Sequence, residues 1–369
     1  MVKAMVAYHI IQAIIAVCLS VGAMDSLLGN KFHLGEEFDK GIRAAGTLLL
    51  CMSGYLAIAP VCAKLLTPIV TPLCHMTGLD PSVLAGLFFA NDSGGASLAI
   101  QLAQDKQIGL YNAYIVSAEM GTTVMYTVGL SMSTITPAQK KYAAYGIACG
   151  IVTMPISCIA GAAVAGFQLD AVLFNTLPLI ALSVLLCLLL LFAERVTVLI
   201  VVLLGKFMTA LSVVALTIAA CQELTGVKIL SGLETLPDIY PIVGGIAIFL
   251  AGAYPLMAIV QCIFKNQLQK IGSSLCINEV SVKGLILCTL NMLVSYPLLP
   301  EMDEKGVMLN LAFWGSASCI FGDHLAFTSQ QAPALVLPVL ISKLIGGVLA
   351  CLLALGLYNC CFKAERKST

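Results

Sequence analysis

The sequence predicts an all-α, polytopic membrane protein built from two related halves. Of its 369 residues, 60% are hydrophobic and only 10% are charged, whereas a soluble domain carries about 25% charged residues. The hydrophobic residues form runs of about 20, the length that a helix needs to cross a bilayer. In addition, short apolar segments are broken by polar residues at corresponding places in the two halves, a pattern typical of transporters.

Composition and motifs also exclude several classes of protein. The net charge is zero, so nothing indicates a nucleic-acid partner. The 15 cysteines lie almost entirely in apolar runs without CxxC or Cys/His spacing, so we predict small buried side chains, without disulfides or a metal site. No HExxH, GxSxG or Walker motif is present. We therefore expect neither an enzyme nor a bound cofactor, and an intramembrane hydrolase is the weaker alternative.

The predicted elements divide the chain into five parts. These are a first span with an amphipathic connection (1–43), a first half with a broken segment at 81–104 (44–166), two linking spans and a loop (167–241), a second half with broken segments at 280–303 and 319–333 (242–360), and a basic cytoplasmic tail (361–369). Within the first half, a span at 44–66 precedes a proline-punctuated stretch, 67–78. That stretch is too short to cross the bilayer, so we expect it to be a separate interfacial helix.

Each half contains a segment whose arms are too short to cross. In 81–104, the polar sequence NDSGG at 91–95 separates two apolar arms, each of about nine residues, or ~14 Å of helix. Residues 280–303 show the same order, with Asn291 and Ser295 in the break. Such an arm reaches about half-way through a bilayer. Each segment is therefore either a re-entrant hairpin with its polar tip near the midplane or one discontinuous span.

Three pairs of similar positions indicate an internal duplication. Residues 54–60 (GYLAIAP) resemble 252–258 (GAYPLMA), Asn91 matches Asn291, and Gly121 matches Gly322. The offsets are 198, 200 and 201 residues, near enough to constant to suggest two related halves. Interrupted segments at matching places in a repeat point to where a substrate binds.

The distribution of Lys and Arg decides between the two topologies. If both broken segments are re-entrant, the chain crosses nine times, and 17 basic residues outside the spans divide thirteen to four between the two faces. If both cross fully, eleven spans divide the same residues nine to eight. The positive-inside rule requires an asymmetry, so we predict nine spans, with the N-terminus outside and the C-terminus in the cytoplasm. Five spans then separate the starts of the two halves, which makes the repeats inverted.

Two carboxylates lie in predicted helix breaks, Asp92 in the first half and Asp323 in the second. Membrane proteins tolerate broken helices only beside a cavity, and carboxylates at that depth call for a cation, either a substrate or protons. The alternatives are that Asp92 stabilises its own turn and that Asp323 either caps a helix end or belongs to a buried hydrogen-bonded pair. The predicted substrate-binding residues are Asp92, Asn91, Ser93, Gly94, Gly95, Asn291, Ser295, Asp323 and His324.

Three further titratable residues have open roles. Glu119 lies within a span and is either a proton site or the partner of an intramembrane lysine. Lys343 lies deep in the last span and is either a proton or charge site or a lysine whose side chain extends to the interface. His324, next to Asp323, is either a neutral partner that orients this carboxylate or a proton carrier, since histidine titrates near physiological pH.

Three longer motifs indicate a family. Residues 150–161 (GIVTMPISCIAG), 321–327 (FGDHLAF) and 342–347 (SKLIGG) closely resemble the ethanolamine permease family of the bacterial ethanolamine-utilisation system. The resemblance runs nearly end to end and includes the Asp-x-Gly-Gly at 92–95 and Asn291. It implies a bacterial inner-membrane protein that brings ethanolamine into the cell, where ammonia-lyase and microcompartment enzymes consume it.

The chain departs from the family pattern at two of these sites. Family members carry Cys-Asp-Met-Gly-Gly where this chain has NDSGG, and an apolar residue where it has Glu119. The first change leaves Asp92 in place, and the second makes Glu119 a poor candidate for a family-wide substrate ligand. Family members also have a longer loop before the second half and a longer C-terminal tail.

The sequence and the resemblance together predict uptake of ethanolamine as its ammonium cation. A buried cation without a counter-charge is costly, so at least one of Asp92 and Asp323 should be ionised when the substrate is bound. A permease for another small amine or amino alcohol, or a channel for ammonium-like solutes, is the alternative. The expected partners are the substrate and the lipid bilayer, while the sequence leaves homo-oligomer formation and energy coupling open.

Overall fold

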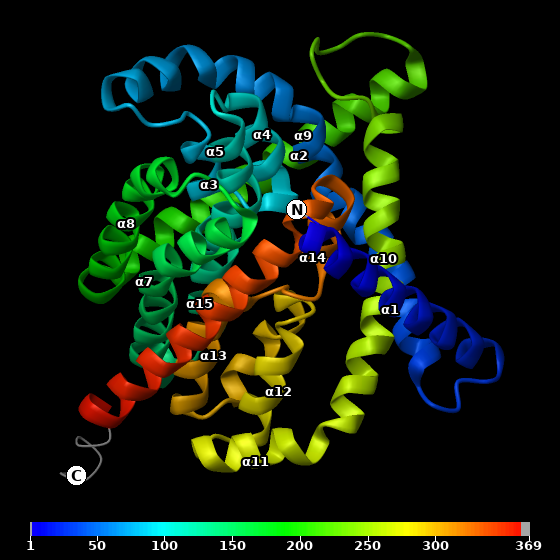
Figure 1. Ribbon diagram of the computed structural model, residues 1–369, viewed down its shortest axis with the longest axis vertical. Coiled ribbons are helices and arrows are strands. Elements are labelled where there is room, and N and C mark those ends of the chain that lie inside the picture. Colours follow the sequence, from blue (N-terminus) through cyan, green and yellow to red (C-terminus); the bar gives the residue numbers. More distant parts are fainter. Residues whose placement is uncertain (1, 363–369) are drawn as a thin grey trace.

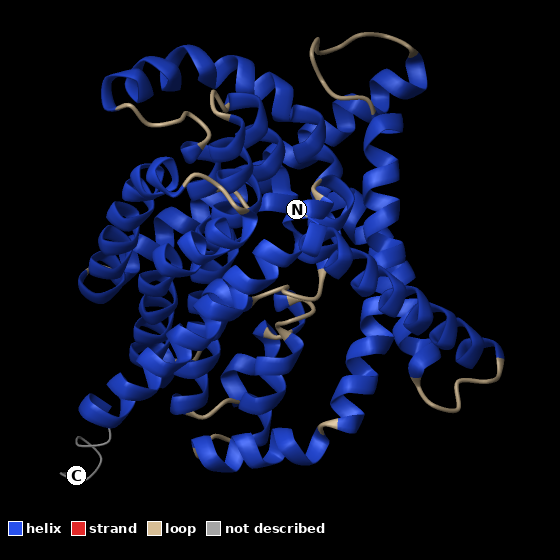
Figure 2. Cartoon of the chain, viewed as in Figure 1, coloured by secondary structure: helices blue, strands red, loops and turns tan. Residues whose placement is uncertain are grey.

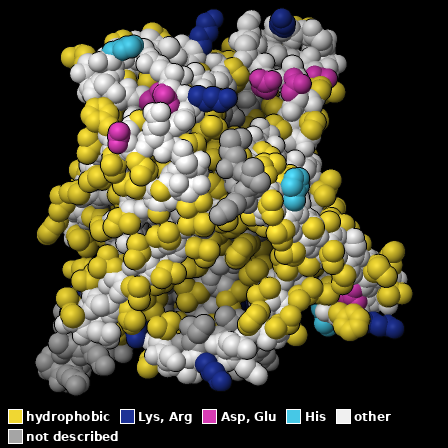
Figure 3. All heavy atoms as spheres, viewed as in Figure 1, with side chains coloured by type: hydrophobic (Ala, Val, Ile, Leu, Met, Phe, Trp, Pro, Cys, Tyr) yellow, Lys and Arg dark blue, Asp and Glu magenta, His cyan; other side chains and the backbone are white. Residues whose placement is uncertain are grey.

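The computed structural model describes residues 2–362, so the predicted basic tail, 361–369, lies almost wholly outside the described part of the chain. The described residues form helices joined by short loops, with no strand among them (Figure 2). Hydrophobic side chains cover the middle of the face shown in Figure 3, and charged side chains gather toward its upper and lower ends. Seven of the described helices are long and apolar enough to cross a membrane: α1 (Val2–Leu27), α2 (Leu34–Thr77), α7 (Lys140–Ala165), α8 (Leu169–Phe192), α9 (Glu194–Thr225), α10 (Leu236–Ile263) and α15 (Val336–Leu357).

Two further elements of similar length are interrupted. The first runs from α5 (Lys106–Leu110) to α6 (Val128–Thr134) through the π-helical segments η2 (Tyr111–Gly121) and η3 (Thr123–Thr127). The second consists of α13 (Glu304–Ala317) and α14 (Asp323–Gln331), which residues 318–322 separate. The first of these elements lies in the predicted first half (44–166), and the second lies in the predicted second half (242–360).

Helix α2 corrects one sequence prediction. The connection, the span at 44–66 and the stretch at 67–78 form one continuous helix that contains Pro60, Pro68 and Pro72, so the separate interfacial helix was wrong. Proline removes one backbone N–H and bends a helix, but neighbouring groups can satisfy the freed carbonyls in a membrane. The 44 residues would extend about 66 Å. In Figure 1 the last turns of α2 lie across the top of the molecule.

The two ends of the first broken segment lie close together. It comprises α3 (Val83–Phe88), the π-turn η1 (Asn91–Gly95) and α4 (Ala96–Leu102). The Asp80 carboxylate, just before α3, accepts hydrogen bonds from the backbone N–H groups of Gln104 at 2.9 Å and Asp105 at 2.8 Å, just after α4. Asp80 therefore joins the two ends of the segment.

The second broken segment is closed in the same way. It comprises α12 (Glu279–Leu287), η5 (Met292–Val294) and η6 (Tyr296–Glu301), and it follows the short helix α11 (Lys265–Leu275). The backbone N–H of Asn278 donates to Asp303 at 2.9 Å, and the Asn278 side chain donates to the Glu301 carbonyl at 2.9 Å. Here too, the residues before and after the segment are in contact.

Helices of the two predicted halves, 44–166 and 242–360, pack against one another. Helix α2 packs on α10, and α7 packs on both α13 and α15. The break of each short segment lies against a glycine of the interrupted element in its own half. An added Cβ would lie 2.1 Å from the Phe89 carbonyl oxygen at Gly121 and 1.5 Å from the Leu290 carbonyl oxygen at Gly322. These contacts require glycine at both positions, because any side chain would collide with backbone.

Candidate functional site

The break between α13 and α14 is held against the second broken segment by backbone hydrogen bonds. The N–H of Cys319 donates to the Cys288 carbonyl at 2.7 Å, and the N–H of Phe321 donates to the Thr289 carbonyl at 2.8 Å. Cys319 has a φ of +55°, a left-handed conformation that favours glycine. These contacts fix the start of α14, where Asp323 and His324 are the first two residues.

The corresponding break in the first half presents Asp92. Its carboxylate accepts a hydrogen bond from the Ser93 hydroxyl at 3.1 Å, and the Ser93 and Tyr126 hydroxyls lie 2.9 Å apart. Gly94 supplies the turn with a φ of +89°, and an added Cβ at Gly95 would lie 2.3 Å from the Phe89 carbonyl oxygen. The chain can therefore turn sharply here while staying packed.

The structure brings the two aspartates together. Helix α14 packs against η1, and Asp92 and Asp323 lie within electrostatic range of each other. The Asp92 side chain is buried, whereas Asp323 is half-buried. Two like charges in a poorly solvated region repel strongly, so this arrangement favours a cation or a proton between them.

Several buried polar atoms around these aspartates have no hydrogen-bond partner. Leaving a buried donor or acceptor unpaired costs about 1–3 kcal/mol, so unpaired atoms within the breaks and the second segment indicate where a ligand or water could bind. The half-buried Asn291 lies in the break of the second segment. In the sequence it follows Cys288 and Thr289, whose carbonyls accept the hydrogen bonds described above, and precedes Ser295. The unpaired atoms are Nδ2 and Oδ1 of Asn91, Oδ1 of Asp323, Nδ1 of His324, and the hydroxyls of Ser295 and Ser318.

Lys343 lies close to this region, and its ammonium group donates three hydrogen bonds to backbone carbonyls. Its ammonium donates to the backbone carbonyls of Ala118 at 2.7 Å, Ser316 at 3.0 Å and Ser318 at 2.9 Å. Ser316 and Ser318 are at the C-terminal end of α13, where helical carbonyls lack intrahelical partners and the helix dipole is negative. Lys343 is therefore buried and caps a helix end rather than extending to a membrane interface.

Glu119 is also buried and has partners in both halves. The Ser157 hydroxyl donates to its Oε2 at 2.6 Å, and the Ser342 hydroxyl donates to its Oε1. The charges of Glu119 and Lys343 attract each other, although the lysine donates its hydrogen bonds to carbonyls.

We name Glu119, Ser157, Ser342 and Lys343 the latch cluster. We name Asn91, Asp92, Asp323 and His324 the tip cluster.

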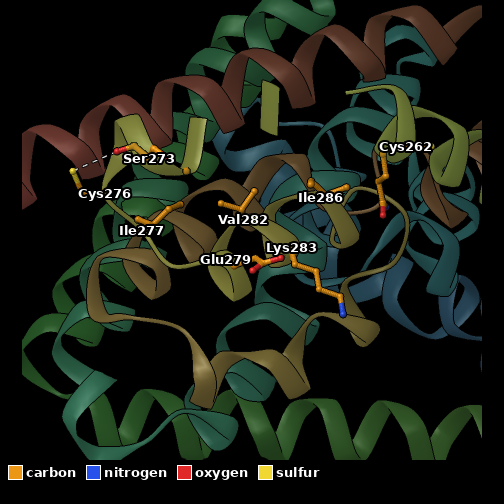
Figure 4. A pocket seen from close by; sticks show the side chains of 10 residues that line it. Cys262, Ser273, Cys276, Ile277, Glu279, Val282, Lys283 and Ile286 are labelled. Carbon is orange, nitrogen blue, oxygen red and sulfur yellow. Dashed lines mark hydrogen bonds between the residues drawn. The ribbon is translucent and has the colours of Figure 1, made fainter. Parts of the chain in front are cut away.

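Two cavities lie beside the broken segments. One of about 350 Å³ reaches the turn of the first segment at Ser93 and Gly94 and is otherwise lined mainly by apolar residues of α2 and α9. The other, of about 740 Å³, lies among α10, α11 and α12 at the start of the second segment, with Glu279 and Lys283 on its wall (Figure 4). Each broken segment thus borders an open space.

Sequence reasoning missed four residues of this region. Tyr126 lies one helical turn beyond Thr122 and meets Ser93 only because η1 packs on the interrupted element. Cys319 was included among the small apolar cysteines, although it begins the break before Asp323. Ser157 and Ser342 lie inside motifs used for the family resemblance, but their contact with Glu119 could not be read from spacing.

Comparison with known proteins shows which family the chain belongs to. The family described as "Ethanolamine utilisation protein, EutH" matches residues 8–357. The chain belongs to the EutH family. It is 38% identical over 350 residues to a protein of Listeria monocytogenes named "Probable ethanolamine permease EutH", covering 95% of this chain and 93% of that protein.

Other relatives match almost as fully. The chain is 34% identical over 338 residues to the "Uncharacterized protein YxeR" of Bacillus subtilis, covering 91% of each chain. It is 33% identical over 340 residues to the "Probable ethanolamine permease EutH" of Salmonella typhimurium, covering 86% of this chain and 83% of that protein. No solved structure matches the chain. The family resemblance predicted from the three motifs is confirmed.

Proposed function

We propose that this membrane protein imports ethanolamine, as its ammonium cation, into the cell. The observation that carries the proposal is the meeting of Asp92 and Asp323, one from each half, among unpaired polar atoms. The names of its EutH relatives supply the substrate. A singly charged ammonium between two carboxylates would relieve their repulsion, because burial of an unbalanced charge is costly.

The unpaired atoms suit the other end of this substrate. Ethanolamine carries one hydroxyl, which both donates and accepts a hydrogen bond. Asn91 offers an amide with both functions unpaired, and Ser295 and His324 add further unpaired atoms. Ser93, Gly94, Gly95 and Asn291 complete the predicted site by shaping the two breaks.

Uptake into proteoliposomes tests this function. Radiolabelled ethanolamine uptake by the purified protein should saturate, and unlabelled ethanolamine should compete for it. Comparing uptake with and without an imposed proton gradient shows whether transport is coupled to protons. Absence of ethanolamine uptake by folded protein would contradict the proposal, and unsaturable conductance would favour a channel.

The proposed topology has nine spans, formed by the seven long helices and the two interrupted elements. Residues 81–104 and 280–303 would be re-entrant, which the contacts between their ends support. The halves 44–166 and 242–360 would be inverted repeats, with the N-terminus outside and the C-terminus in the cytoplasm.

Accessibility of single cysteines tests this topology. Cysteines placed at Lys64 and Lys106, which flank the first broken segment, should both be labelled from outside in a background without reactive native cysteines. Cysteines at Lys270 and Lys305, which flank the second, should both be labelled only from inside. If the members of both pairs lie on opposite faces, the chain has eleven spans and parallel repeats.

A further inference from the structure

The break before α14 brings together three side chains that can each bind a transition-metal ion such as Zn²⁺. The Sγ of Cys319, a carboxylate oxygen of Asp323 and a ring nitrogen of His324 all lie within 4.8 Å of one another. Cys319 and His324 are 1% and 2% exposed. Thiolate, carboxylate and imidazole are the ligands that Zn²⁺ takes in proteins.

One observation beyond this grouping points to a ligand. Nδ1 of the buried His324 and Oδ1 of Asp323 have no hydrogen-bond partner. These atoms belong to two of the three side chains that would coordinate the metal, and buried polar atoms without partners are uncommon.

The charges of the three ligands alone would balance those of a divalent metal ion. One Zn²⁺ with one thiolate, one carboxylate and one neutral imidazole has a net charge of zero, which minimises the cost of burial in a region of low dielectric constant. Bonds of about 2.0–2.3 Å place tetrahedral ligands ~3.3–3.8 Å apart, so side-chain movements of about 1 Å would complete the set.

We propose that Cys319, Asp323 and His324 form a binding site for Zn²⁺, and that the bound ion blocks ethanolamine uptake. Binding would replace the thiol proton of Cys319 by the metal and release that proton to solvent, without any redox change. The blocking effect rests on the proposed function, because Asp323 and His324 would then be unavailable to the substrate. Metal binding itself does not depend on that function.

Spectroscopy with Co²⁺ tests the site without any transport assay. Purified, metal-free protein titrated with Co²⁺ should develop the near-ultraviolet charge-transfer absorption of a thiolate–cobalt bond, and Zn²⁺ should abolish it. Cys319→Ser should remove this absorption and weaken Zn²⁺ affinity at least tenfold. Cys288→Ser is the matched control, because this buried cysteine lies in the facing segment but outside the ligand set, and it should retain both. Equal Zn²⁺ affinity and absorption in Cys319→Ser and the unmodified protein would overturn the site.

Inhibition of uptake then tests the blocking effect. Zn²⁺ should inhibit ethanolamine uptake in the unmodified protein and in Cys288→Ser. It should inhibit Cys319→Ser only at concentrations at least tenfold higher, each variant being compared with its own zinc-free rate. Tight Zn²⁺ binding at Cys319 without inhibition would overturn the blocking effect. Absence of ethanolamine uptake without zinc would contradict the proposed function and leave the spectroscopic result intact.

Discussion

The latch cluster and the tip cluster are both polar groups inside an apolar protein, but they differ in how their atoms are paired. In the latch cluster, the three donors of Lys343 meet three carbonyls, and each Glu119 oxygen accepts from a serine hydroxyl. In the tip cluster, Asn91, Asp323 and His324 each leave at least one buried atom unpaired. Paired groups stabilise a unique fold, whereas clustered unpaired groups indicate a binding site.

The latch cluster also joins parts of the chain that are far apart in sequence. Glu119 and Ser157 come from the first half, whereas Ser342 and Lys343 come from the second. Lys343 binds carbonyls of both halves, at Ala118 and at Ser316 and Ser318. It thereby fixes the end of α13, just before the break that carries Asp323. The latch cluster should therefore govern folding, and the tip cluster should govern uptake.

Replacement of Lys343 by methionine should have the largest effect. It would leave three buried carbonyls without donors, at about 1–3 kcal/mol each, and would remove the charge that balances Glu119. We expect strongly reduced folded protein, measured by size-exclusion chromatography of detergent extracts and by the melting temperature. Lys206→Met, at an exposed lysine within α9, is the control and should fold normally. Normal folding of Lys343→Met would show that the latch cluster does not stabilise the protein.

Replacement of Asp323 by asparagine should affect uptake and leave folding intact. It removes one charge from the proposed ammonium site, and a lost charge contact reduces affinity by roughly ten- to thousandfold. The measurement is the concentration dependence of ethanolamine uptake at equal amounts of folded protein. Asp170→Asn, at the exposed start of α8, is the control. Unchanged uptake by Asp323→Asn would exclude Asp323 as a counter-charge.

Replacement of Asp92 by asparagine should also reduce uptake, but by a smaller factor. Asp92 already accepts a hydrogen bond from Ser93, so part of its carboxylate serves its own turn. We expect a loss of roughly ten- to hundredfold in affinity with a normal melting temperature. A drop in the melting temperature without a change in affinity would instead identify Asp92 as a turn residue.

The sequence predicted an all-helical membrane protein because long apolar runs have a direct physical cause in the thickness of the bilayer. It failed at α2, where Pro68 and Pro72 suggested a boundary. In a membrane, a helix that continues through a proline costs less free energy than a chain break that leaves backbone groups without hydrogen bonds. The π-helical turns of η2 have no comparable signal in the sequence, because they depend on packing against α3 and α4.

The candidate site was predictable only in part. Asp92 and Asp323 stood out because carboxylates in apolar surroundings are rare. The partners of Lys343 could not be anticipated, since they are backbone carbonyls, which every residue carries. Cys319 was missed because its significance depends on its distance from Asp323 and His324, and sequence spacing across a break does not fix that distance.

Substitution of His324 has the smallest expected effect among these tests of the two clusters. His324 belongs to the tip cluster, but its role there does not require it to be charged. The ammonium of Lys343 lies within electrostatic range of its ring, and a second positive charge there would repel both this lysine and the substrate. A neutral imidazole would instead orient Asp323 or bond the substrate hydroxyl through its unpaired Nδ1. The two roles differ in whether transport requires His324 to change charge.

Replacement of His324 by glutamine separates these roles, because glutamine keeps the hydrogen-bonding capacity but cannot take up a proton. If the ring is a neutral partner, uptake should fall by less than about tenfold, since only the geometry of one hydrogen bond changes. The pH dependence of uptake should stay the same, and exchange of internal for external ethanolamine should continue. Both are measured in proteoliposomes between pH 5.5 and 8, a range of about one unit or more on either side of the ordinary histidine pKa of about 6.5. Loss of gradient-driven accumulation with exchange preserved would instead identify His324 as the proton carrier, and the tip cluster would then move protons as well as substrate.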